Sequence, residues 1–225
     1  MIYQLPETVV FDLDGTLVDT GPDLTATLNH VLAGLGRPLV DLATVRDLVG
    51  HGARALIERG LALSGGSTDD EMARAMPMFF DYYAAHICDG SEPYPGIVDA
   101  LDALAEAGVR LAICTNKPIA LSRDLIAALG WTDRFVANLG GDSLAVRKPD
   151  PAHVLATIAA AGGTPERTIY VGDSIVDVLA AKAARVPVVA VTFGFADRPA
   201  AELGADALIT HYDQLLSALD ALMRR

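Results

Sequence analysis

Hydrophobic and polar positions follow two patterns along this chain. Between residues 20 and 86, apolar residues recur at the three- and four-residue spacing of helices, and no strand pattern interrupts them. After residue 94, short apolar runs alternate with helical patterns, and one more such run occupies residues 8–11. A lone strand could not satisfy its backbone, so this first run belongs with the later ones. We therefore predict an α/β fold: a doubly wound (Rossmann-like), mostly parallel sheet with a small all-helical cap inserted after the first strand.

The change of pattern sets the predicted domain boundaries. Residues 1–19 and 87–225 form the α/β core domain, and residues 20–86 form the cap, called the helical block below. Expected strands lie at 8–11, 109–114, near 135–136, 168–171, 188–191 and 207–210. Expected core helices lie at 97–107, 119–129, 151–161 and 175–184, and a last one ends near 222.

Composition limits the classes of partner. The chain has 225 residues, of which 52% are hydrophobic, so a large core can be buried. Its formal net charge of -12 argues against nucleic acid, which binds clustered Lys and Arg. The two cysteines, Cys88 and Cys114, suggest neither a disulfide framework nor a zinc site, and Cys114 is expected in the core. The sequence shows no signal-peptide pattern and no apolar run of membrane-spanning length, so we expect a cytoplasmic protein without a membrane partner.

Polar residues gather where expected strands end. The first run stops at two carboxylates, Asp12 and Asp14, which repel each other unless a cation or a proton intervenes. Strand ends of a parallel sheet share one edge, where such folds bind their ligands. Three later segments reach the same edge: Thr115-Asn116-Lys117-Pro118, Arg147-Lys148-Pro149-Asp150, and Gly172-Asp173-Ser174 with Asp177. Together these side chains could hold a phosphoryl group.

The same segments resemble, in order, the four motifs of the haloacid-dehalogenase-like hydrolase superfamily. The matching residues are Asp12-Leu13-Asp14-Gly15-Thr16, Thr115, Lys148 and Gly172-Asp173-Ser174-Ile175-Val176-Asp177. The helical block resembles the small cap of that family. Tyr94-Pro95-Gly96, Gly140-Gly141-Asp142 and Lys148-Pro149-Asp150-Pro151 are similar to the phosphoglycolate phosphatase branch. One departure is Arg185, where relatives commonly have Gly after an Ala-rich helix.

The resemblance implies a role for each motif residue. Asp12 is the expected nucleophile, which forms an aspartyl-phosphate, and Asp14 is the expected general acid and then base. Thr115 and Lys148 would bind the phosphoryl oxygens. A Mg²⁺ ion would be held by Asp12, the backbone carbonyl of Asp14, and Asp173.

The remaining candidates support these roles. Gly15 allows a tight turn against the phosphate, and Thr16 fixes that turn. Asp177 either orients Asp173 or a metal-bound water, or is a first-turn acid that favours its helix. Asn116, next to Thr115, is a candidate contact to the phosphate.

Two assignments stay open. Lys117 competes with Lys148 as the phosphate-binding cation, although Lys-Pro-Asp-Pro fits the third motif better. In the helical block, His51 and Arg54 could bind a substrate carboxylate at a helix start, but a glycine-flanked histidine is more often a hinge or surface feature.

The leading hypothesis is a Mg²⁺-dependent phosphatase for a small phosphorylated metabolite, with 2-phosphoglycolate as the first candidate. The enzyme would be a monomer or a homodimer. A phosphomutase of the β-phosphoglucomutase type is the closest alternative. From a different class, a phospho-accepting receiver-like signalling module also combines acids, Thr and Lys on such a sheet, although it needs no cap.

Overall fold

A computed structural model describes residues 3–195 and 198–224. The first part of the chain, through the helical block, contains β1 (Thr8–Phe11), β2 (Val18–Asp19), α1 (Gly21–Gly34), α2 (Leu42–Arg46), α3 (Ala53–Ala62), α4 (Asp69–Ala85) and β3 (Glu92–Pro93). The second part contains α5 (Ile97–Glu106), β4 (Arg110–Cys114), α6 (Ile119–Ala128), β5 (Ala137–Leu139), α7 (Pro151–Ala160), β6 (Thr168–Gly172), α8 (Ile175–Ala183), β7 (Val188–Val191), β8 (Ala207–Ile209) and α9 (Leu215–Met223).

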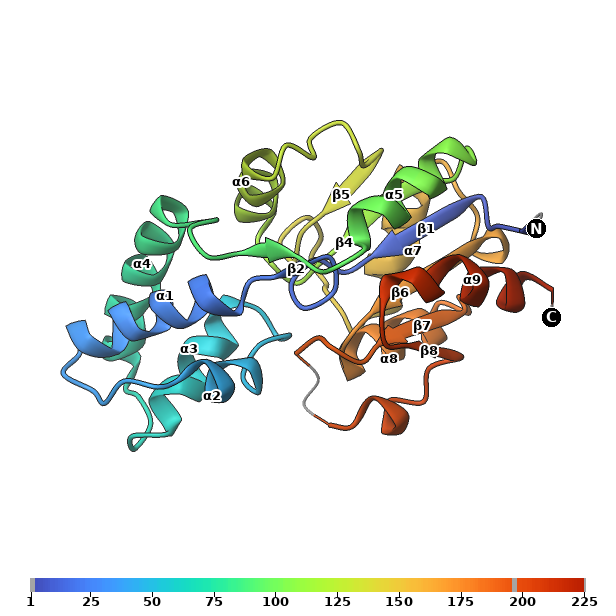
Figure 1. The fold of residues 1–225 in the computed structure, drawn as a ribbon. Helices are drawn as coiled ribbons and strands as arrows, with labels where there is room; N and C mark the ends of the chain where they lie inside the picture. The colour runs from blue at the N-terminus through green and yellow to red at the C-terminus, as the bar shows by residue number, and fades with distance from the viewer. Residues whose placement is uncertain (1–2, 196–197, 225) are drawn as a thin grey trace.

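Six strands form one parallel sheet in the order β5-β4-β1-β6-β7-β8 (Figure 1). Strand β1 lies between β4 and β6, with Phe11 opposite Ile113 on one side and Val171 on the other. The three strands therefore end at the same level, and the loops that follow them meet at one edge of the sheet. The predicted fold class is confirmed.

Alternating side chains on the strands supply a hydrophobic core on each face of the sheet. In β1, Val9 and Phe11 pack into the core covered by α5, α6 and α9, while Val10 packs into the core covered by α7 and α8. Cys114 is fully buried in the second core, as predicted. Because both faces are covered, ligand access is left to the strand ends.

The helices α1 to α4 pack around a third core and lie beyond the strand-end edge of the sheet (Figure 1). Leu121 at the start of α6 also belongs to this core, so the helical block contacts the sheet domain there. The assignment of residues 20–86 as a separate cap domain stays a prediction.

Two short segments that the sequence analysis missed join the helical block to the sheet. The strands β2 and β3 pair antiparallel, with Val18 opposite Pro93 and Asp19 opposite Glu92. Next to this ribbon, the buried carboxylate of Asp23 accepts hydrogen bonds from the backbone N–H groups of Gly90 and Ser91. The chain entering the block is thus bonded to the chain leaving it.

The short strand expected near residues 135–136 is present as β5, which begins at Ala137. Phe135, just before it, packs against the core on the α5 face of the sheet. In the part of the chain that the structure describes, no helix has both the length and the apolar character that a bilayer span requires.

Candidate active site

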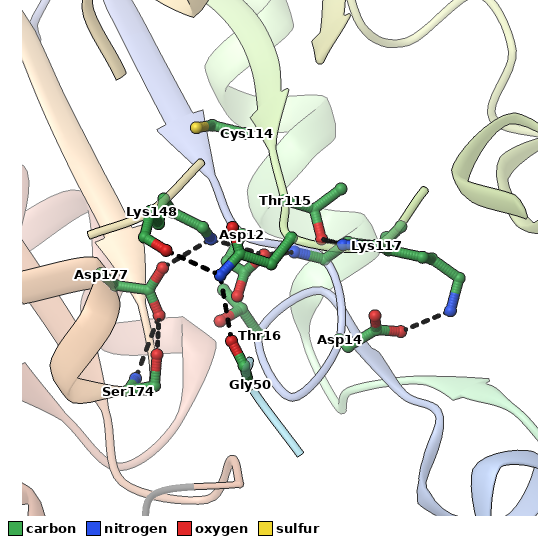
Figure 2. A network of polar contacts seen from close by, with 12 residues as sticks. Asp12, Asp14, Thr16, Gly50, Cys114, Thr115, Lys117, Lys148, Ser174 and Asp177 are labelled. Atoms are coloured by element: carbon green, nitrogen blue, oxygen red, sulfur yellow. Dashed lines mark hydrogen bonds and ion pairs between the residues drawn. The ribbon is translucent and has the colours of Figure 1, made fainter. Parts of the chain in front are cut away.

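Lys148 lies between two carboxylates at the strand-end edge. Its Nζ atom is 2.9 Å from Oδ1 of Asp12 and 2.7 Å from Oδ1 of Asp177, and it donates to the Tyr170 hydroxyl at 2.9 Å. Burial alone would lower the pKa of the Lys148 ammonium, but the charges of Asp12 and Asp177 outweigh this and hold the pKa above its ordinary value. Lys148 is therefore a fixed positive charge beside Asp12. Figure 2 shows Lys148 and Asp177 on one side of Asp12.

Asp12 follows β1 directly and is held by backbone as well as by Lys148. Its N–H donates to the carbonyl of Val171, and its Oδ1 accepts from the N–H of Leu13 at 2.7 Å. Among the described residues, the Lys148 and Leu13 contacts both reach Oδ1, and Oδ2 has no hydrogen-bond partner. One oxygen of a well-oriented carboxylate is thus available for a bond to another atom.

Asp173 is buried at the end of β6 and oriented by two donors. The Thr16 hydroxyl donates to Oδ1 at 3.0 Å, and the N–H of Phe195 donates to Oδ2 at 2.6 Å. Backbone packs closely on both sides: a Cβ atom on Gly15 would lie 2.4 Å from Oδ2, and one on Gly194 would lie 2.3 Å from the Asp173 Cβ. Gly15 also has a φ of 81°, which favours glycine. The predicted tight turn at Gly15 and Thr16 therefore packs against Asp173.

Carboxylate oxygens of Asp12, Asp173 and Asp177 lie within 4.8 Å of one another, and all three residues are buried. Three carboxylates with one ammonium leave two negative charges. Burial raises the pKa of Asp12 to about 7 against the pull of Lys148, and burial together with Asp177 and Asp12 raises the pKa of Asp173 well above its ordinary value. Both carboxylates are therefore costly to keep charged in these surroundings. A divalent cation, which prefers oxygen ligands, fits this donor set.

The side chain of Asp14 is not part of that cluster. Its Oδ1 accepts from the Thr20 hydroxyl at 2.8 Å and from Nζ of Lys117 at 2.9 Å. The Lys117 ammonium also donates to the Tyr83 hydroxyl on α4 at 2.5 Å and lies 4.3 Å from the centre of that ring. Figure 2 shows Asp14 and Lys117 on the side of Asp12 opposite Lys148 and Asp177. Lys117 and Lys148, the two candidates for the phosphate-binding cation, thus pair with different carboxylates.

Thr115 and Asn116 follow β4 directly, and Asn116 connects the sheet to the helical block. The Thr115 hydroxyl accepts from the N–H of Lys117 at 3.1 Å. The Asn116 amide donates to the carbonyls of Gly50 and Lys148 at 3.2 and 3.1 Å. Asn116 therefore bonds to two loops from different parts of the chain, and its buried Oδ1 has no partner among the described residues.

The predicted motif around Gly140 supports this loop. A Cβ atom on Gly141 would lie 2.5 Å from the carbonyl oxygen of Asn116, and one on Gly140 would lie 2.4 Å from the N atom of Ile119. The Asp142 carboxylate accepts from that same Ile119 N–H at 2.8 Å. The motif acts on the site through backbone packing.

Asp177 has no free side-chain oxygen. Besides Lys148, its Oδ1 accepts from the Tyr170 hydroxyl at 3.0 Å, and its Oδ2 accepts from both the N–H and the hydroxyl of Ser174. These bonds make Asp177 the N3 residue of a capping box on α8 as well as the partner of Lys148.

A pocket opens between the sheet edge and the helical block. Its lining residues are Asp12, Asp14, Leu24, Val49, Gly50, Gly52, Ala53, Leu56, Phe79, Tyr83, Thr115, Asn116, Lys117, Pro118 and Leu121. The polar groups come from the strand ends, except for Tyr83, and most of the apolar ones come from the helical block. Such a combination holds the reacting end of a small ligand by polar contacts and excludes water from it.

The predicted carboxylate site at His51 and Arg54 is not part of this lining. Arg54 is exposed and pairs with Glu58 one turn later on α3, at 2.7 Å. The glycines on either side of His51 line the pocket, with backbone φ values of 104° at Gly50 and 87° at Gly52. A role for Arg54 in binding substrate stays a prediction that its position does not support.

Sequence reasoning missed several residues that shape the site. No contact was predicted for Tyr83, Tyr170 or Tyr212, although Tyr212 donates to the Thr16 carbonyl at 2.7 Å. The N–H of Phe195 has no side-chain signal that could have revealed it. The pairing of Lys117 with Asp14 depends on the path of two loops.

The family model described as haloacid dehalogenase-like hydrolase matches residues 9–191, which include all of the strand-end segments above. This chain belongs to that family. The chain is 50% identical to a phosphoglycolate phosphatase of Mesorhizobium japonicum, over 92% of each chain. It is 46% identical to one of Agrobacterium fabrum, over 96% of this chain and 93% of the other. The crystal structure of a predicted phosphoglycolate phosphatase from Haemophilus somnus is 32% identical, with a TM-score of 0.88 over 94% of this chain and 96% of the other. The predicted family is confirmed, and the protein is a hydrolase.

Proposed function

We propose that this hydrolase is a Mg²⁺-dependent phosphatase that converts 2-phosphoglycolate to glycolate and phosphate. The observation that carries the proposal is the placement of Asp12, with one oxygen held by Lys148 and Leu13 and the other without a partner, beside the buried acids of a divalent-cation site. The names of the relatives at 50% and 46% identity supply the substrate.

Asp12 acts as the nucleophile. Its unpartnered oxygen forms a bond to phosphorus while the bond from phosphorus to the bridging oxygen breaks, and the phosphoryl group stays on Asp12 as an aspartyl-phosphate. Lys148, held between Asp12 and Asp177, and the buried Thr115 hydroxyl offset the charge on the phosphoryl oxygens.

Asp14 handles the proton. It lines the pocket and gives a proton to the bridging oxygen as glycolate leaves, and then takes a proton from the water that cleaves the aspartyl-phosphate. Its bonds to Thr20 and Lys117 both use Oδ1, so the other oxygen is available for this exchange.

Asp12, Asp173 and the backbone carbonyl of Asp14 would hold the Mg²⁺ ion. The bound ion offsets the negative charge that otherwise opposes attack of a carboxylate on a phosphate dianion. Asp177 keeps Lys148 in place instead of contributing a free oxygen of its own.

Residues 20–86 serve as a cap over the reaction. The apolar side chains of Leu24, Leu56 and Phe79 line the pocket opposite the strand ends and exclude bulk water from the aspartyl-phosphate. A closed pocket also favours a small phosphorylated metabolite over a phosphoprotein.

A phosphate-release screen over small phosphorylated metabolites tests the proposal. We expect release from 2-phosphoglycolate that needs Mg²⁺ and falls by on the order of 10³-fold or more in Asp12→Asn. Asp133→Asn, the same change at an exposed position, is the matched control and keeps full activity. Conversion of a sugar phosphate to its isomer without phosphate release indicates the phosphomutase, and a single stable phosphate per chain indicates the receiver. Either result contradicts the proposal.

A further inference from the structure

Lys117 is the one cationic side chain in the pocket lining, considering residues 3–195 and 198–224. Lys148 lies behind Asp12, and Arg54 is paired at the surface. Lys117 has only 5% of its surface exposed, and its neighbours in the pocket are largely apolar. Burying an ammonium in such surroundings is costly unless anionic and hydrogen-bonding partners offset the cost.

The bonds of Lys117 leave one donor unused. An ammonium has three N–H donors, and Nζ of Lys117 uses one on Asp14 and one on the Tyr83 hydroxyl. Burial and the charge of Asp14 raise the pKa of Tyr83 well above its ordinary value, so the phenol keeps its proton. Lys117 and Tyr83 thus offer two donors beside Asp14 with no acceptor assigned to them among the described residues.

The chemistry of the substrate matches this position. In 2-phosphoglycolate a single CH₂ group separates the bridging oxygen from the carboxylate. The bridging oxygen meets Asp14 when it receives its proton, so the carboxylate must lie within a few bonds' length of Asp14. Lys117, at 2.9 Å from Oδ1 of Asp14, is within that reach.

We propose that the Lys117 ammonium and the Tyr83 hydroxyl bind the carboxylate of the leaving group and select phosphate monoesters that bear a carboxylate next to the ester carbon. The inference rests on the proposed function for the placement of the bridging oxygen. It moves the carboxylate site predicted at His51 and Arg54 to the end of β4 and to α4.

The test compares two substrates in three variants. 2-Phosphoglycolate and ethyl phosphate share the ester and differ in the carboxylate. The quantity compared is kcat/KM for 2-phosphoglycolate divided by kcat/KM for ethyl phosphate. In Lys117→Met we expect this ratio to fall roughly 10- to 100-fold, as for loss of a charge-assisted hydrogen bond. Tyr83→Phe lowers the same ratio by a smaller factor. Lys182→Met, the same substitution at an exposed lysine on α8, leaves the ratio and both rates unchanged.

Equal losses on both substrates would overturn the inference, because Lys117 would then act only by positioning Asp14. If Lys117→Met fails to fold, Tyr83→Phe decides by the same ratio. A wild-type enzyme that shows no preference for carboxylates refutes the role of Lys117. A wild-type enzyme that ignores 2-phosphoglycolate but hydrolyses 2-phospholactate, with the Lys117→Met loss intact, refutes the proposed substrate and retains the role of Lys117.

Discussion

The Lys148 ammonium lies 2.9 Å from Oδ1 of Asp12, and both side chains are buried. Asp177 holds the same ammonium from the other side at 2.7 Å. The positive charge that orients the proposed nucleophile is therefore also the charge that makes two buried carboxylates tolerable. Activity and stability depend on the same atom.

We expect the Lys148→Met substitution to lower both the stability and the activity of the enzyme. Removing one partner of a buried ion pair costs about 3–5 kcal/mol of unfolding free energy, because the remaining carboxylates stay buried without a counter-ion. Phosphatase activity falls by at least about 10³-fold, a loss typical of removing a central catalytic charge. Urea unfolding and initial rates measure the two effects. A stable variant with a tenth of the wild-type activity would refute the role of Lys148.

Gly15→Ala tests the packing of the first loop on Asp173. The new Cβ would lie 2.4 Å from Oδ2 of Asp173, so we expect Asp173 to move, the Mg²⁺ concentration for half-maximal rate to rise at least about tenfold, and kcat to fall. Gly36→Ala is the matched control, because Gly36 has a similar φ of 68° and nothing lies within 4 Å of its added Cβ. It costs about 1 kcal/mol of stability and leaves the Mg²⁺ dependence unchanged. Equal behaviour of the two variants contradicts the prediction.

Arg185 lies one residue beyond the C-cap of α8 and has a φ of 59°, the left-handed conformation that favours glycine. We expect Arg185→Gly to raise the free energy of unfolding by about 0.5–1 kcal/mol, since the side chain is exposed and the strain is relieved. Ala183→Gly, at the last residue of the same helix, lowers it by up to about 0.5–1 kcal/mol. Chemical denaturation of both variants measures the two signs.

His153 is fully buried on α7, and burial together with the charge of Lys148 lowers its pKa from 6.5 to about 4. Below pH 6.5 the His153 imidazole therefore binds a proton in the unfolded chain but stays neutral in the folded protein. The contribution of neutral His153 to the free energy of unfolding is complete above pH 6.5 and is lost as the pH falls towards 4. The loss amounts to about 2 kcal/mol at pH 5. We expect the free energy of unfolding of His153→Leu to fall less between pH 7 and pH 5 than that of the wild type, as measured by urea unfolding at both pH values. Parallel slopes for the two proteins would refute it.

The sequence predicted most of the acidic residues of the site but not which side chains they contact. Asp12 and Asp173 could be placed together because each follows an apolar β-branched run, and parallel strands bring such ends to one edge. The partner of Asp14 could not be predicted, since Lys117 reaches it by the path of a loop. The ribbon of β2 and β3 was missed because two residues are too few to show a periodicity. The start of β5 was placed too early because Phe135 and Val136 resemble a strand.

That two-strand ribbon has a mechanical consequence. Val18 pairs with Pro93 and Asp19 with Glu92, so the two chain crossings between sheet and helices cannot slide past each other. Any change in the angle between the sheet and the helices α1 to α4 would therefore move both crossings together. Tyr83 on α4 and Lys117 after β4 lie on the two sides of this ribbon, so the 2.5 Å contact between them depends on the ribbon staying paired.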